Sequence, residues 1–182
     1  MESLQSIKDR IPDYAKDLRL NLDAVLNRSS LTPAQANGAA LAAAFAAKSA
    51  PVVAALRDSG ALEATQAQAA LTAAALMGMN NVWYPYVEMA ADPELKTVRP
   101  ELRMNAYATH GGVDRTSFEL YALAASIVGK CEFCIQAHYK LLRENGFSTQ
   151  QLRDVGRIAA VVNAVAQVLS AERIESNERV VA

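Results

Sequence analysis

The hydrophobic positions of this chain recur with the three- and four-residue spacing that places side chains on one face of an α-helix. Over residues 11–26, the apolar positions that share such a face are Tyr14, Leu18, Leu22, Val25 and Leu26. Pro12 suits the first turn of that helix, where its missing N–H has no partner to lose. No stretch of four or more residues alternates between apolar and polar side chains with the β-branched enrichment of a strand. The pattern therefore predicts an all-α protein.

Start and stop signals divide the rest of the chain into further helices. Residues 32–35 and 148–151 are capping boxes, which open helices. Gly78 and the Asn145-Gly146 pair are helix stops. The expected helices after the first cover residues 33–48, 51–59, 62–77, a short segment ending at Met89, 101–108, 114–128, 131–144 and 148–169.

Alanine is dense on every side of two of these helices, over 39–47 and 67–75. Side chains this small allow helix backbones to approach closely, and such helices are typically buried or placed at a subunit contact. High intrinsic helix propensity is the simpler explanation of the same composition. Alanine density alone therefore leaves subunit assembly through these helices open.

Length, charge and hydropathy limit the kind of protein this is. The 182 residues fit a single domain, 1–182. A net charge of -1, with acids and bases interleaved, provides no basic face for nucleic acid or anionic lipid. The chain has no run of the roughly 18 apolar residues that a membrane span needs, and its first residues lack the pattern of a signal peptide. We therefore expect a cytoplasmic protein with no membrane segment and no nucleic-acid partner.

A faint internal repeat relates two parts of the chain at an offset of 51 residues. Residues 74–78 align with 125–129, and Asn80 falls where Cys131 stands. The abundance of small residues is an alternative explanation of this match. If the repeat is real, the domain consists of two similar helical halves, and only the second, about 100–170, carries the chemistry.

Both cysteines and one of the two histidines lie in one short stretch, residues 129–138. Within a helix, Cys131, Cys134 and His138 share a face, because residues three and four apart are neighbours. A Cys-x-x-Cys pair at the start of a helix has the separation that a disulfide needs, about 5–6 Å between Cα atoms. Gly129 offers a stop for the preceding helix and leaves Cys131 in an exposed first turn, where the helix dipole favours a thiolate. The stretch predicts a redox centre.

Two other interpretations of the cysteines remain open. A zinc site could use Cys131, Cys134, His138 and a carboxylate, although this spacing within one helix differs from the usual structural zinc motifs. The cysteines could also be inert core residues. A purely structural disulfide is disfavoured in a reducing compartment, and so short a loop would constrain the unfolded chain little.

His138 could be an ordinary helix histidine, but four residues after Cys134 its imidazole can accept the thiol proton or pair with the thiolate. Glu119 lies twelve residues before Cys131, in the expected first turn of the preceding helix. It has a simple structural interpretation there, because Thr116-x-x-Glu119 has the pattern of a capping box. Spacing alone leaves a chemical role of Glu119 open.

These residues resemble a known signature. Glu119 followed by Cys131-x-x-Cys134-x-x-x-His138 is similar to the motif of the alkyl hydroperoxidase D family, within the carboxymuconolactone decarboxylase-like superfamily. The similarity extends over nearly the whole chain, through the segments 11–18, 77–82 and 102–105. One position departs from it, because some members carry a second histidine just before the second cysteine, where this chain has Phe133.

The resemblance implies an all-α subunit, often trimeric, that acts in peroxide defence. It assigns Cys131 and Cys134 as the redox pair and His138 and Glu119 as a proton relay. It also implies weak hydroperoxide reduction and reduction of the disulfide of a partner peroxiredoxin. Electrons would come from dihydrolipoamide carried on the acyltransferase of a 2-oxoacid dehydrogenase complex. No tightly bound cofactor and no metal are expected.

Three functions remain to be separated. The first is a thiol-dependent peroxidase and peroxiredoxin reductase, in which proximity to His138 favours attack by Cys134 and first-turn exposure favours exchange at Cys131. The second is a decarboxylase of a small carboxylated lactone, which needs no cysteine pair. The third is a redox-switched binding or scaffold protein, which would form the disulfide without turnover.

Overall fold

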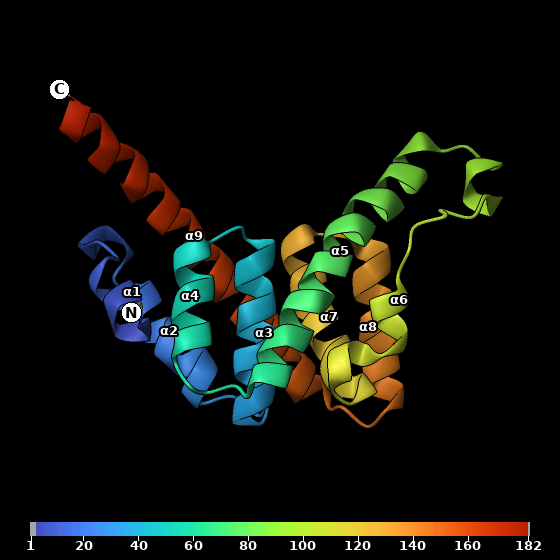
Figure 1. The fold of residues 1–182 in the computed structure, drawn as a ribbon, viewed down its shortest axis with the longest axis horizontal. Helices are drawn as coiled ribbons and strands as arrows, with labels where there is room; N and C mark the ends of the chain where they lie inside the picture. The colour runs from blue at the N-terminus through green and yellow to red at the C-terminus, as the bar shows by residue number, and fades with distance from the viewer. Residues whose placement is uncertain (1–2, 182) are drawn as a thin grey trace.

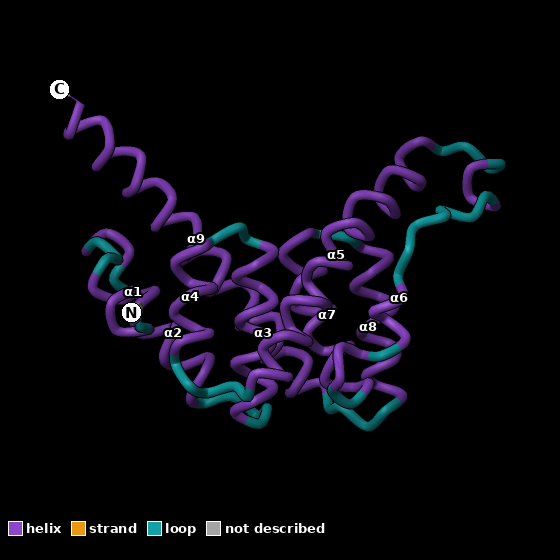
Figure 2. The backbone as a smooth tube through the Cα atoms, in the orientation of Figure 1, coloured by secondary structure: helices purple, strands orange, loops and turns teal. Residues whose placement is uncertain are grey.

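The computed structural model describes residues 3–181, with side chains as far as Glu172, and the regular structure in this range is helical throughout (Figure 1, Figure 2). The predicted all-α class is therefore confirmed. The α-helices are α1 (Leu4–Asp9), α2 (Asp17–Asn27), α3 (Pro33–Ala46), α4 (Ala50–Asp58), α5 (Ala64–Ala90), α6 (Asn105–Ala108), α7 (Arg115–Gly129), α8 (Glu132–Glu144) and α9 (Thr149–Val181). Between them lie the 3-10 helices η1 (Asp13–Ala15), η2 (Leu95–Thr97) and η3 (His110–Gly112).

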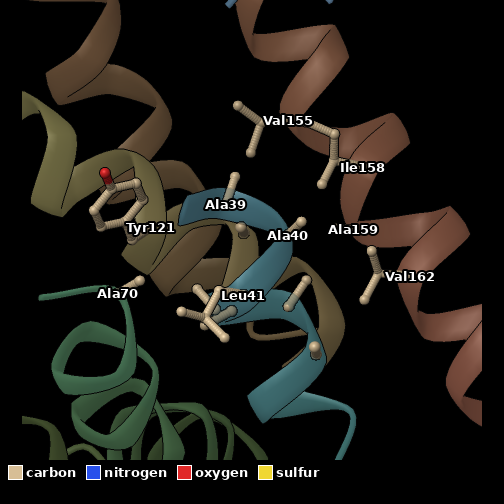
Figure 3. Packing of buried hydrophobic residues seen from close by; sticks show 14 of the residues in the cluster. Ala39, Ala40, Leu41, Ala70, Tyr121, Val155, Ile158, Ala159 and Val162 are labelled. Carbon is tan, nitrogen blue, oxygen red and sulfur yellow. The ribbon is translucent and has the colours of Figure 1, made fainter. Parts of the chain in front are cut away.

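Helix α3 is the centre of the core. It packs against α5, α7 and α9, and Figure 3 shows Ala39, Ala40 and Leu41 among side chains of these neighbours. Residues 39–44 are fully buried. The alanine density here therefore serves close packing of helices within the subunit. The approach is closest at Gly38, where a Cβ atom would lie 2.2 Å from Cε1 of Tyr121.

The predicted helix stop at Gly78 is wrong. Helix α5 continues through Gly78 and the aromatic cluster to Ala90, with Pro85 inside it. Glycine costs about 1 kcal/mol in a helix interior, and packing along one face of a long helix outweighs that cost. Because α5 is continuous, its second half projects from the body of the molecule together with residues 91–103 (Figure 1).

The N-terminal prediction is partly wrong. The stretch 11–26 is divided into η1 and α2, because Pro12 is extended, and Tyr14 is 74% exposed. Leu22, Val25 and Leu26 are buried, as their spacing predicts. Helix α1 was not predicted; it begins at the reciprocal capping box of Ser3 and Ser6.

Two later helices also differ from their predicted lengths. The segment 101–108 is helical only from Asn105, where α6 begins. Helix α9 continues past Leu169 to Val181. The part Thr149–Glu172 is long and apolar enough to pass for a membrane span, but its apolar positions, such as Val155, Ile158 and Val162, are buried in the core. Core packing accounts for that composition.

Candidate active site

The two cysteines lie at the junction of α7 and α8. Helix α7 ends as Lys130 adopts the left-handed conformation, with φ 55°, which turns the chain into α8. Cys131 is the N-cap of α8, and its sulfur accepts the backbone N–H of Cys134 at 3.3 Å. The two sulfurs form a disulfide across a Cα–Cα distance of 5.3 Å. Both side chains are buried, Cys131 completely, so the predicted exposed first-turn site of Cys131 is wrong.

Helix α5 closes over the cysteines from one side. The carbonyl oxygen of Asn80 lies 3.9 Å from Sγ of Cys131. The next residue, Asn81, donates from Nδ2 to the carbonyl oxygen of Ala125 at 3.2 Å. A Cβ atom on Gly129 would lie 2.1 Å from that Nδ2. Gly129 therefore matters less as a helix stop than because it has no side chain, so that Asn81 of α5 can pack against α7 at this position.

A buried histidine–carboxylate pair lies one helical turn beyond Cys134. Nδ1 of His138 is 2.6 Å from Oε2 of Glu119, and its Nε2 is 3.2 Å from Sδ of Met77. Burial raises the pKa of the Glu119 carboxyl, but hydrogen bonds from His138 and Tyr107, with the charges of His138 and Arg115, outweigh it and lower the pKa. Glu119 is therefore an ionised acceptor, which fixes Nδ1 as the protonated nitrogen of the ring.

The capping-box interpretation of Glu119 is wrong. Asp114 is the N-cap of α7, and its carboxylate accepts the N–H of Ser117 at 2.9 Å. Glu119 is the fifth residue of the helix, past its first turn, and is fully buried. Its side chain points to His138 instead of to the helix end.

Tyr107 also belongs to this cluster, and it was not predicted from the sequence. Its hydroxyl donates a hydrogen bond to Oε1 of Glu119. Tyr107 comes from α6, a separate short helix, so no spacing relates it to the cysteine motif. Met77 was missed for the same reason, since it comes from α5.

A cavity of about 710 Å³ opens beside the motif, between the second half of α5 and the start of α8. Its lining includes Lys130, Glu132 and Phe133 beside the cysteines in the sequence, and Tyr84 of α5. The rings of Tyr84 and Phe133 are stacked, with centroids 4.2 Å apart. The residue in place of the second histidine thus contributes an aromatic surface next to the disulfide.

The arrangement differs from a zinc site. Across the part of the chain that the structure describes, no group of three or more His, Cys, Asp or Glu side chains is arranged to hold a metal ion. His138 instead makes its contacts to Glu119 and Met77. A disulfide beside a polarised histidine is suited to thiol redox chemistry.

Known proteins are similar to this chain over most of its length. Residues 93–174 match the model of the carboxymuconolactone decarboxylase family. The chain is 47% identical to an alkyl hydroperoxide reductase AhpD of Rhodospirillum centenum, over 97% of this chain and 95% of that protein. It is 42% identical to proteins of the same name from Bradyrhizobium sp. (strain BTAi1), over 94% of this chain and 96% of that protein, and from Coxiella burnetii, over 91% and 96%.

Proposed function

Because the chain belongs to the alkyl hydroperoxide reductase AhpD family, we propose that it reduces organic hydroperoxides with the Cys131/Cys134 pair. The observation that carries the proposal is the buried contact, 2.6 Å long, between Glu119 of α7 and His138, which lies on the helix that begins at these cysteines. A thiol near its ordinary pKa of about 8.5 is only a few per cent ionised at pH 7, so a base on the same helix face increases its reactivity.

In the reaction we propose, Cys134 is the thiol coupled to His138, and its thiolate attacks a peroxide oxygen. The O–O bond breaks, the sulfur is oxidised to a sulfenic acid, and the alkoxide takes up a proton and leaves as an alcohol. The Cys131 thiol then attacks the sulfenic sulfur, water leaves, and the disulfide forms. A dithiol donor returns two electrons and two protons by thiol–disulfide exchange.

Family membership supports a proposal for the physiological donor and partner. We infer that protein-bound dihydrolipoamide, on the lipoylated acyltransferase of a 2-oxoacid dehydrogenase complex, reduces the disulfide. The Cys131/Cys134 pair in turn reduces the disulfide of a peroxiredoxin of the alkyl hydroperoxide reductase type. This exchange requires a reducing compartment, which supports a cytoplasmic location. The working assembly we infer is a homotrimer.

Steady-state turnover with tert-butyl hydroperoxide and excess dihydrolipoamide tests the proposal. We expect Cys131→Ser and Cys134→Ser each to abolish turnover, because either serine prevents the disulfide. Oxidation of the wild type should yield an intramolecular disulfide and no covalent dimer. Wild-type turnover in either variant would refute the two-cysteine mechanism, and a protein that oxidises once without turning over would be a redox switch. Decarboxylation of a lactone would survive both substitutions.

A further inference from the structure

The carboxylate of Glu119 is held from two directions by two different helices. Its Oε2 lies 2.6 Å from Nδ1 of His138 on α8. Its Oε1 accepts the hydroxyl of Tyr107 on α6. Each oxygen thus has one hydrogen-bond partner, and rotation of the carboxylate would break both hydrogen bonds.

Packing holds Tyr107 in the position from which it can make this contact. Its ring meets Phe118 edge-on, with centroids 5.6 Å apart, and His110 at 6.4 Å. Phe118 is fully buried and precedes Glu119 in α7. The hydroxyl is therefore fixed relative to the carboxylate by the ring, independently of the hydrogen bond.

Tyr107 is the neutral member of the cluster around Glu119. Burial, with the hydrogen bond and the charge of Glu119, raises the pKa of Tyr107, so its hydroxyl remains a donor throughout the working range of pH. Arg115, on the same helix as Glu119, has Nε 4.0 Å from Oε1, and its side chain is largely exposed. His138 faces the carboxylate from α8, His110 of η3 faces the tyrosine ring, and α5 contributes the uncharged Met77.

We propose that Tyr107 is a positioning residue of the proposed thiol reaction: it keeps Oε2 of Glu119 on Nδ1 of His138 and so sets the pH at which Cys134 loses its proton. Without the hydroxyl, Oε1 loses its buried donor, and the carboxylate turns toward the exposed guanidinium of Arg115. Nδ1 of His138 then loses its acceptor, and the imidazolium that stabilises the thiolate becomes less favourable. This inference rests on the proposed function, because it requires a histidine-coupled thiol.

The pH profile of thiol alkylation in the reduced protein tests this role directly. Tyr107→Phe retains the ring and removes only the hydroxyl. We expect the midpoint to move upward by about half a pH unit, which is roughly threefold slower alkylation near pH 7. Glu119→Gln should move it further in the same direction. In the Glu119→Gln background, Tyr107→Phe should add no further shift, because the charge on which it acts is gone.

Tyr139→Phe is the matched control, since Tyr139 is exposed on α8, the helix of His138. It should leave the midpoint unchanged, and thermal unfolding should show that both Phe variants are folded. An unchanged or lowered midpoint in Tyr107→Phe, or an equal shift in the Glu119→Gln background, would refute the role of Tyr107. If His138→Phe and Glu119→Gln also leave the midpoint unchanged, the histidine-coupled thiol itself is refuted.

Discussion

Glu119 is a fully buried carboxylate that lies 2.6 Å from Nδ1 of His138 and 4.0 Å from Nε of Arg115. A charge in such a position persists only when hydrogen bonds replace its water. Here the donors are His138 and Tyr107, and they lower the pKa of Glu119 despite its burial. The carboxylate therefore stays charged at neutral pH and can stabilise a proton on the histidine.

This charge leads to a prediction for His138 and Glu119. His138→Phe removes the proton acceptor, and Glu119→Gln keeps the shape and removes the charge. Both should slow thiol alkylation near pH 7 and raise its pH midpoint, by about one unit for His138→Phe and less for Glu119→Gln. Above the shifted midpoint the rates should converge with the wild type, since hydroxide then removes the proton.

Elemental analysis of the purified protein accompanies that titration. One zinc ion per chain, with unfolding on chelation, would favour a metal site over the proton relay. An unchanged midpoint in both variants would have the same consequence.

Gly129 gives a second prediction at the scale of the residue. An alanine here would bring its Cβ to 2.1 Å from Nδ2 and 2.8 Å from Cβ of Asn81, so a rotation of the asparagine side chain cannot relieve the clash. Gly129→Ala should lower the free energy of unfolding by about 1–3 kcal/mol. Gly78→Ala is the matched control, because no atom lies within 4 Å of its added Cβ. It should raise stability by up to about 1 kcal/mol in the same denaturant titration.

The predictable part of the site is α8 with its N-cap. The spacing of Cys134 and His138 fixes their common face, because helix geometry is the same in every protein, and Cys131 precedes the first residue of this helix. The position of Glu119 depends on how α7 packs against α8, and spacing alone gave it a capping role that the structure does not support. The position of Tyr107 depends on the path of residues 91–104, where the predicted helix begins at 101 and the observed one only at Asn105.

At the scale of the helix, capping residues were better guides than helix breakers. The capping boxes at Thr32 and Ser148 open α3 and α9 as predicted, because a cap makes local hydrogen bonds that need no other element. Gly78 failed as a stop because its cost is small against the packing of α5 on α3 and α7. Helix α7 actually ends at Lys130, which adopts a left-handed backbone conformation that residues with a side chain such as lysine rarely adopt.

Asp154 of α9 connects this helix to the segment between α2 and α3. Its Oδ2 accepts the N–H and the hydroxyl of Ser30, each at 2.8 Å, and its Oδ1 accepts from Arg153 and Arg157 at 3.1 Å. Burial raises the pKa of the Asp154 carboxyl, but these hydrogen bonds outweigh it and hold the pKa well below the ordinary value. The contact therefore stabilises the fold only while the carboxylate is charged.

Asp154→Asn should lower the free energy of unfolding at pH 7 by about 2 kcal/mol. Because the pKa is lower in the folded state, the contribution is complete above the unfolded-state pKa of about 3.9 and is lost as the pH falls toward the folded-state value. Urea unfolding of both proteins at pH 7 and pH 3 measures this difference. A difference that is equal or larger at pH 3 would contradict the assignment.

For the whole molecule, the alanine-rich residues 39–44 are buried inside the subunit and do not indicate an assembly surface. A group of large exposed apolar side chains lies instead on the projecting half of α5 and the segment after it: Val82, Tyr86, Met89 and Val98. Exposed apolar groups gathered on one projection are typical of a protein–protein contact. We expect a second copy of the chain to cover them.

Sedimentation at micromolar concentration should therefore show a species of three 19.5 kDa subunits. Met89→Arg should weaken this assembly, because Met89 is 79% exposed on the projection. Leu20→Arg, at a position 72% exposed on α2, should leave it intact. A wild-type protein that sediments only as the monomer would refute the trimer, and equal effects of the two arginines would refute this surface as the contact.

The hydrogen bond that caps the N-terminus of α8 is accepted by a redox-active atom, because the backbone N–H of Cys134 donates to Sγ of Cys131. Reduction frees this sulfur to ionise, and a thiolate accepts a stronger hydrogen bond than a disulfide sulfur does. In the reduced protein, the amide proton of Cys134 should therefore shift downfield in the NMR spectrum as the pH rises and Cys131 loses its proton, and the oxidised protein should show no such shift. A single backbone resonance then reports the redox state of each subunit, so the chain carries its own spectroscopic indicator.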